Sequence, residues 1–115
     1  SSVIIFSYCL CLFLIQGVKQ MPLRHFGFIV VGDDFVQDQG TDKFRMKVVG
    51  VSKPKQAIDV AKSMVADGVQ AIELCGAFSP VIVGKIIEAI EYKVPVGTVS
   101  YGAESIPGLY KLFSD

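Results

Sequence analysis

Short apolar runs and amphipathic stretches alternate along most of this chain. Four runs of mainly apolar residues are typical of strands that are covered on both faces. They occupy residues 25–32, 44–51, 69–75 and 94–100. The segment between the first two runs, residues 32–43, is polar and rich in turn-forming residues, so we expect a loop there.

Two stretches carry apolar residues at the spacing of one helical face. The first begins after Ser52, a typical N-cap residue, has Pro54 in its first turn and ends at Gly68. The second begins after Ser79, which is again a typical N-cap residue. Their apolar positions are Ala57, Val60, Ala61, Met64 and Val65 in the first helix and Val83, Ile86, Ile87 and Ile90 in the second. A further short helix is expected at residues 105–113.

The expected elements follow the order strand, strand, helix, strand, helix, strand, helix. Strands that alternate with amphipathic helices form βαβ crossovers, which make the strands parallel. We therefore predict an α/β domain with a small, mixed, mostly parallel four-stranded sheet. The segment at residues 32–43 is short for a parallel crossover. This shortness favours a hairpin, and hence an antiparallel arrangement, between the first two strands.

An apolar leader, residues 1–20, precedes the single α/β domain that we predict at residues 21–115. A signal peptide would have a basic start and a cleavage site of small residues, and the leader has neither. A membrane span takes about 20 apolar residues, and this run is shorter. A third interpretation is that translation starts at Met21 and the leader is an artefact. We expect a cytoplasmic domain whose core excludes the leader, with membrane anchoring or export through residues 1–20 as the alternative.

The charges of the chain are balanced, with 11 Lys and Arg residues against 11 Asp and Glu residues. This balance, without a basic patch interleaved with aromatic residues, argues against nucleic-acid binding. Only Cys75 lies in the predicted domain, so no disulfide can form within it, and the single histidine, His25, argues against a zinc site. We expect neither a metal nor an organic cofactor. A domain this small gains stability from association, so we expect a homo-oligomer.

Candidate chemistry lies where two segments are predicted to meet, at residues 73–80 and 100–105. In open parallel sheets, ligands bind at the carboxyl ends of the strands. Cys75 ends an apolar strand just before a helix N-terminus, where the helix dipole favours a thiolate, and Glu73 points to the same face. These two residues are the candidate catalytic pair. The candidate ligand-binding residues are Gly76, Phe78, Ser79, Tyr101 and Glu104.

Each candidate also has a structural interpretation. Cys75 is also explained as a small buried apolar residue, and Glu73 as one half of a salt bridge. The turn at residues 76–80 offers free backbone amides to an anion, so the first hypothesis is a protein that binds a small anionic metabolite. The alternatives are a cysteine-dependent isomerase or lyase that uses Cys75 and Glu73, and a non-catalytic oligomeric interaction subunit.

Four segments carry a resemblance to a known family, namely GFIVVGDDF, FRMKVVGV, AIDVAKSMVADGVQAIELCGAFSP and KVPVGTVSYGAESIP. On these segments the chain resembles a family of small uncharacterised bacterial proteins, domain of unknown function 6506. The resemblance extends over residues 22–113, and its most specific parts are residues 73–78 and 93–97. It implies no established activity.

Overall fold

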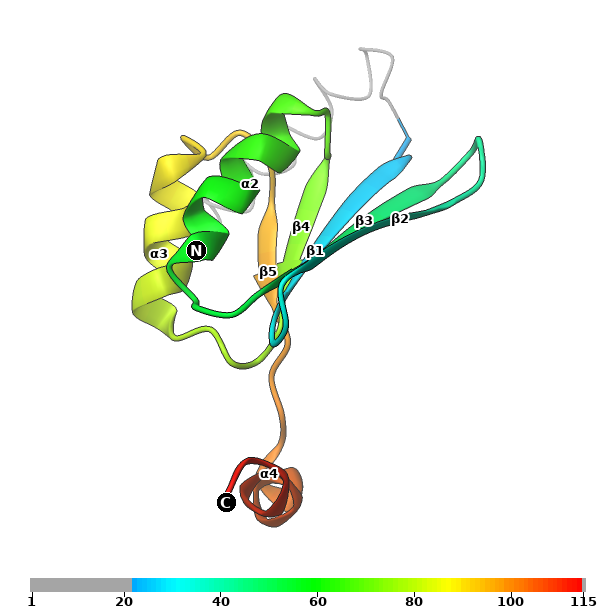
Figure 1. The fold of residues 1–115 in the computed structure, drawn as a ribbon. Helices are drawn as coiled ribbons and strands as arrows, with labels where there is room; N and C mark the ends of the chain where they lie inside the picture. Colours follow the sequence, from blue (N-terminus) through cyan, green and yellow to red (C-terminus); the bar gives the residue numbers. More distant parts are fainter. Residues whose placement is uncertain (1–21, 115) are drawn as a thin grey trace, which may run out of the picture.

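The computed structural model describes residues 22–114, which fold into a mixed α/β structure (Figure 1). A five-stranded sheet has the strand order β2-β3-β1-β4-β5. All neighbouring strands are parallel except β2, which runs antiparallel to β3. The elements are β1 (His25–Val31), β2 (Phe35–Gly40), β3 (Arg45–Val51), α2 (Gln56–Ala66), β4 (Ala71–Leu74), α3 (Pro80–Ala89), β5 (Val96–Thr98), a 3₁₀ turn η1 (Ala103–Ser105) and α4 (Ile106–Phe113). The predicted α/β class and mostly parallel sheet are confirmed.

The segment predicted as a loop between the first two strands contains a fifth strand, β2, so the prediction of four strands is wrong. This strand occupies an edge of the sheet and all its residues are exposed. It carries the chain back along the sheet, and a tight turn then leads into β3. Consequently β1 runs parallel to β3, with His25 opposite Arg45 and Val31 opposite Val51. The predicted antiparallel pairing of these two strands is wrong. The edge strand β2 returns the chain to the opposite end of the sheet, as a crossover helix usually does, so β3 can run parallel to β1.

The helices α2 and α3 lie side by side on one face of the sheet (Figure 1). The core between them and the strands is apolar throughout, and the part of the chain that the structure describes has no buried polar residue. Predicted helix-face residues Ala57, Met64 and Ile86 are all buried in it. The remaining core side chains are Ile29, Val49, Val51, Ala61, Val69, Ile72, Leu74, Phe78 and Ile90.

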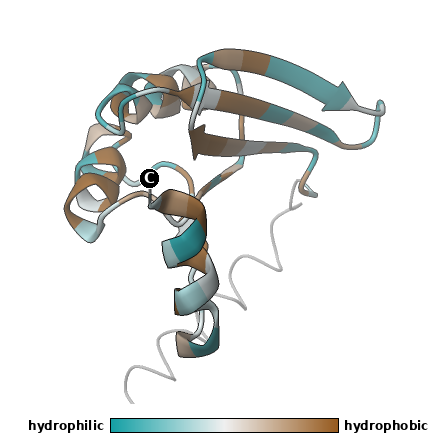
Figure 2. Cartoon of the chain, turned by 60° about the horizontal axis from the view of Figure 1, so that its bottom comes forward, coloured by the Kyte–Doolittle hydropathy of each residue, from teal (hydrophilic) through white to brown (hydrophobic). Residues whose placement is uncertain are grey.

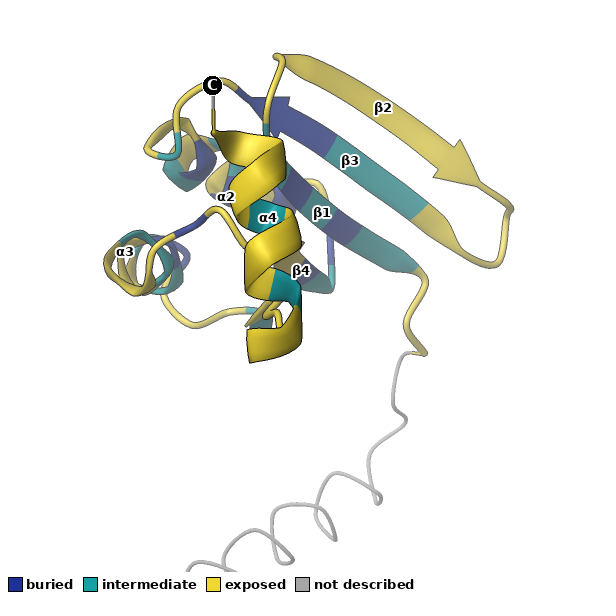
Figure 3. Ribbon diagram, turned by 90° about the horizontal axis from the view of Figure 1, so that it is seen from below, coloured by how far each residue is buried: buried dark blue, intermediate teal, exposed yellow. Residues whose placement is uncertain are grey.

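No helix within residues 22–114 covers the opposite face of the sheet (Figures 1 and 3). We call this the open face and define its apolar part by Phe26 and Phe28 of β1 and Met46 and Val48 of β3. All four side chains are half-buried. They form cross-strand pairs, Phe26 with Met46 and Phe28 with Val48.

The ends of the helices depend on local hydrogen bonds. The Ser79 side chain accepts a hydrogen bond from the Ile82 amide at 3.3 Å, as expected of an N-cap residue. Gly68 has φ +92°, which fits its predicted place at the end of α2. Ser52 is not the N-cap of α2, because the helix begins later, at Gln56. Instead the Ser52 amide donates to the Asp34 carboxylate at 2.9 Å and so ties the β1–β2 turn to the end of β3.

Across residues 22–114 we find no helix with both the length and the apolar character needed to cross a membrane. The leader, residues 1–20, lies outside the described residues, so its interpretation stays a prediction.

Candidate functional site

A cavity of about 510 Å³ lies between α4 and the carboxyl ends of β1 and β4. We call it the strand-end pocket. This is the edge of a parallel sheet where ligands bind in open α/β folds. Its lining residues are Val30, Val31, Cys75, Gly76, Ala77, Tyr101, Leu109 and Phe113.

One wall of the pocket is the turn that follows β4. The Cys75 amide donates to the Ile29 carbonyl at 3.1 Å, which extends the pairing of β4 with β1 by one residue. The half-buried Cys75 Sγ accepts a hydrogen bond from the Val31 amide at 3.3 Å. These two contacts fix the thiol beside the end of β1.

Tyr101 packs directly on the backbone of Gly76. A Cβ at Gly76 would lie 3.1 Å from the Tyr101 ring and 3.1 Å from the Val99 carbonyl oxygen. Glycine therefore permits the close approach of the segment that follows β5. The same segment is anchored to the sheet by the Val99 amide, which donates to the Leu74 carbonyl at 3.0 Å.

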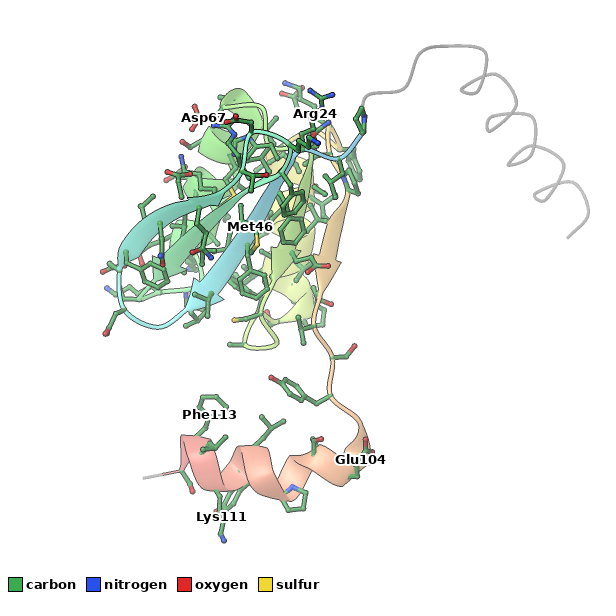
Figure 4. The ribbon with its side chains drawn as sticks, turned by 90° about the vertical axis from the view of Figure 1, so that its right-hand side faces the viewer. Arg24, Met46, Asp67, Glu104, Lys111 and Phe113 are labelled. Atoms are coloured by element: carbon green, nitrogen blue, oxygen red, sulfur yellow. The ribbon has the colours of Figure 1, made fainter. Side chains whose placement is uncertain are left out.

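The helix α4 stands beyond the strand ends and forms the far wall (Figures 1 and 4). Figure 4 shows Phe113 pointing toward the body of the domain and Lys111 pointing away from it. Leu109, four residues before Phe113, is half-buried and lines the same cavity. The apolar side of α4 thus faces the pocket, although Phe113 remains 80% exposed.

The structure brings three of the predicted site residues together in the pocket, namely Cys75, Gly76 and Tyr101. Phe78 lies instead in the core, where it is only 6% exposed, and Ser79 is engaged as the N-cap of α3. Glu104 is exposed and folds back against Gly102.

Glu73 is not among the pocket residues. It is exposed in β4, opposite Gly97 of β5. The side chain lies along the sheet there, since a Cβ at Gly97 would be 3.9 Å from Glu73 Cγ. Cys75 therefore has no carboxylate beside it in the pocket lining, and the proposed pairing with Glu73 is not supported by any contact.

The polar groups of the pocket are few and uncharged. The lining residues carry the Cys75 thiol, the Tyr101 hydroxyl and backbone groups, including the amides of Gly76 and Ala77. These two amides donate no backbone hydrogen bond within residues 22–114. The lining contains no Lys, Arg or His residue. Among the described residues no group of three His, Cys, Asp or Glu side chains could hold a metal ion.

Four lining residues lie outside the segments predicted from the sequence: Val30, Val31, Leu109 and Phe113. Ala77 belongs to the predicted turn at residues 76–80 but was not named as a site residue. A signal for two of them was present, because Ile106, Leu109 and Phe113 follow the spacing of one face of the terminal helix. The position of that helix against the strand ends could not be taken from the spacing.

No curated protein matches this chain. The profile of one family matches residues 24–114, which covers all the strands and helices described above. The match extends over most of the chain, and the protein therefore belongs to the family of unknown function DUF6506.

Proposed function

We propose that this protein binds a small molecule with an apolar or aromatic body and a single carboxylate in the strand-end pocket. The observation that carries the proposal is the cavity of about 510 Å³ between the strand ends and α4, with its apolar walls and its few polar groups at the turn after β4. Cavities of roughly 300–1,000 Å³ with this character are the usual size for small-molecule sites.

The lining determines the class of ligand. Val30, Val31, Leu109 and Phe113 offer apolar surface, which favours a hydrocarbon or aromatic group. The amides of Gly76 and Ala77 precede α3, whose N-terminus carries a partial positive charge that favours an anion. Because no cationic side chain lines the pocket, a group with a single negative charge suits it better than a phosphate dianion.

Three probes separate these contributions in titrations of the full chain followed by NMR. Phenylacetate carries both an aromatic ring and a carboxylate, phenylacetamide carries the ring alone, and inorganic phosphate carries only the negative charge. We expect phenylacetate to shift the Gly76 and Ala77 amide signals and to bind more tightly than either of the others. Binding of phosphate alone, or of none of the probes, would overturn the proposal.

A pair of variants in α4 tests the place of binding. Leu109→Asn puts an amide into the apolar wall and should weaken phenylacetate binding about tenfold. Leu112→Asn makes the same chemical change at an exposed position that does not line the pocket, so it should leave the affinity unchanged. Equal effects of the two variants would place the ligand elsewhere.

Binding is a better-supported proposal than catalysis by Cys75 and Glu73. The thiol lines the pocket, but the second member of the proposed pair is exposed on β4. An isomerase or lyase would need a proton donor or acceptor placed beside the thiol. The catalytic hypothesis would regain support if the protein catalysed turnover that Glu73→Gln abolished.

We also propose a cytoplasmic location. The argument is the free, half-buried thiol of Cys75, which persists as a thiol most readily in a reducing compartment. Fractionation of cells that express the full chain tests this location, and recovery with the membrane or in the medium would contradict it.

A further inference from the structure

The open face of the sheet is apolar at its centre and is flanked by polar side chains, Gln37 and Gln39 on β2 and Glu73 on β4, with the apolar Phe35 at the start of β2. Strands of parallel sheets are normally covered on both faces, because each strand carries apolar side chains on both. Figure 2 shows hydrophobic residues in the central strands, and an edge strand β2 that is hydrophobic at its start and hydrophilic over the rest of its length. Figure 4 looks onto this region and shows Met46 near its middle. An apolar strip with a polar rim is the composition of a protein interface.

The strand register shows that this face is complementary to itself. One row across the sheet contains Gln37 of β2, Val48 of β3, Phe28 of β1 and Glu73 of β4. Beyond Glu73 the row ends at Gly97 of β5, which has no side chain. Among the four side chains of the row, an amide donor and a carboxylate acceptor are therefore the outer two, with two apolar side chains between them. Rotation of these four residues about the point midway between Val48 and Phe28 would place the acceptor opposite the donor.

We propose that two copies of this chain pack open face to open face, about a two-fold axis that runs parallel to the strands between β1 and β3. Phe28 of one copy then packs on Val48 of the second copy. Glu73 lies beside Gln37 of the second copy and accepts a hydrogen bond from its side-chain amide. Face-to-face sheets with nearly aligned strands are a common packing, and a two-fold interface uses the same patch on both subunits.

The neighbouring row supports the same arrangement. It contains Gln39, Met46, Phe26 and Ala71, again with an amide at the β2 end and apolar residues at the centre. The two-fold axis places the Met46 thioether of one copy on the Phe26 ring of the other, a favourable contact between sulfur and an aromatic ring. An axis perpendicular to the strands that runs along the first row would instead bring the two Glu73 carboxylates together, which their like charge opposes.

The groups at the ends of the first row are available for this contact. Glu73 takes part in neither of the ion pairs found in the described part of the chain, which join Lys47 to Asp67 and Lys93 to Glu91. Gln37 donates one side-chain hydrogen bond to Gln39 at 3.5 Å. Its amide nitrogen carries a second hydrogen that can be donated to Glu73 of the second copy.

The oligomeric state of the full chain, measured by light scattering at micromolar concentration, gives the first test. We expect twice the mass of one chain. Val48→Lys places a charge at the centre of the open face and should make the protein monomeric. Val81→Lys is the matched control, because Val81 lies exposed on α3 and should leave the dimer intact. A monomeric parent chain, or equal behaviour of the two variants, would overturn the proposal.

Substitutions that change the charge of Gln37 and Glu73 test the position of the axis. Both residues are exposed, so the result does not depend on how the core tolerates a lysine. Gln37→Glu sets two carboxylates against each other across each contact and should raise the dissociation constant about tenfold. Adding Glu73→Lys to the same chain should restore the original affinity. The two positions lie three strand spacings apart within one copy, about 14 Å, so direct pairing inside one chain cannot explain a rescue. Absence of rescue would exclude this axis.

Discussion

Met64 of α2 packs against Gly27 of β1 so closely that a Cβ on this glycine would lie 2.7 Å from the Met64 sulfur. The same Cβ would lie 3.0 Å from a methyl group of Val69. Gly27 is buried at the centre of the sheet and Met64 is among the largest fully buried side chains. The absence of a side chain at residue 27 therefore sets how near α2 approaches the sheet.

We predict that Gly27→Ala lowers the free energy of unfolding by about 1–3 kcal/mol, because the added methyl group overpacks the core. Denaturant unfolding of the full chain measures the change. Gly84→Ala is the control, since a Cβ there meets no atom within 4 Å. Within a helix this second substitution should raise the free energy of unfolding by about 0.5–1 kcal/mol. A Gly27→Ala protein as stable as the parent would show that Met64 moves aside without cost.

The helices could be predicted from the sequence because their buried side chains repeat along the chain at the helical period. Ala57, Ala61 and Met64 recur at the helical period and all three are buried, as are Ile86 and Ile90. β2 was missed because none of its residues is buried, so no alternation of apolar and polar positions marks it. An edge strand has only one neighbouring strand, which for β2 is β3. β2 is therefore defined by its hydrogen bonds to β3 and not by a pattern of residues within its own segment.

The candidate site was predicted only in part, for a related reason. Cys75 and Gly76 end a strand, and strand ends in parallel sheets meet at one edge whatever the details of the fold. Phe78 was expected at the ligand but is buried, because an aromatic residue in a short strand-to-helix turn can fill the core beneath the helix. Leu109 and Phe113 reach the pocket through the path of the chain after β5, which no local pattern specifies.

Gln70 joins the start of β1 to the start of β4. Its side-chain oxygen accepts hydrogen bonds from the Arg24 amide at 2.7 Å and the His25 amide at 3.0 Å. Its side-chain nitrogen donates to the Pro22 carbonyl at 3.2 Å. One side chain thus satisfies three backbone groups at the point where the chain enters the sheet.

We predict that Gln70→Ala speeds hydrogen exchange of the Arg24 and His25 amides and lowers the free energy of unfolding by about 1 kcal/mol. Gln70→Glu is the matched comparison, because it keeps the accepting oxygen and removes only the donor to Pro22. It should retain most of the protection of the two amides. If both variants exchanged as slowly as the parent, these hydrogen bonds would contribute nothing to order at the start of β1.

The final prediction concerns the thiol of the strand-end pocket. Cys75 is half-buried and lines the cavity, so iodoacetamide should modify it in the folded protein, but more slowly than a fully exposed thiol. Phenylacetate bound in the same cavity should slow the reaction further, and Tyr101→Ala should speed it by removing the ring that packs beside the turn. Tyr92→Ala, at an exposed residue outside the pocket lining, should have no effect. Mass spectrometry of the peptide that carries Cys75 distinguishes it from Cys9 and Cys11. Modification that occurs only after unfolding would show that the thiol belongs to the core rather than to a ligand site.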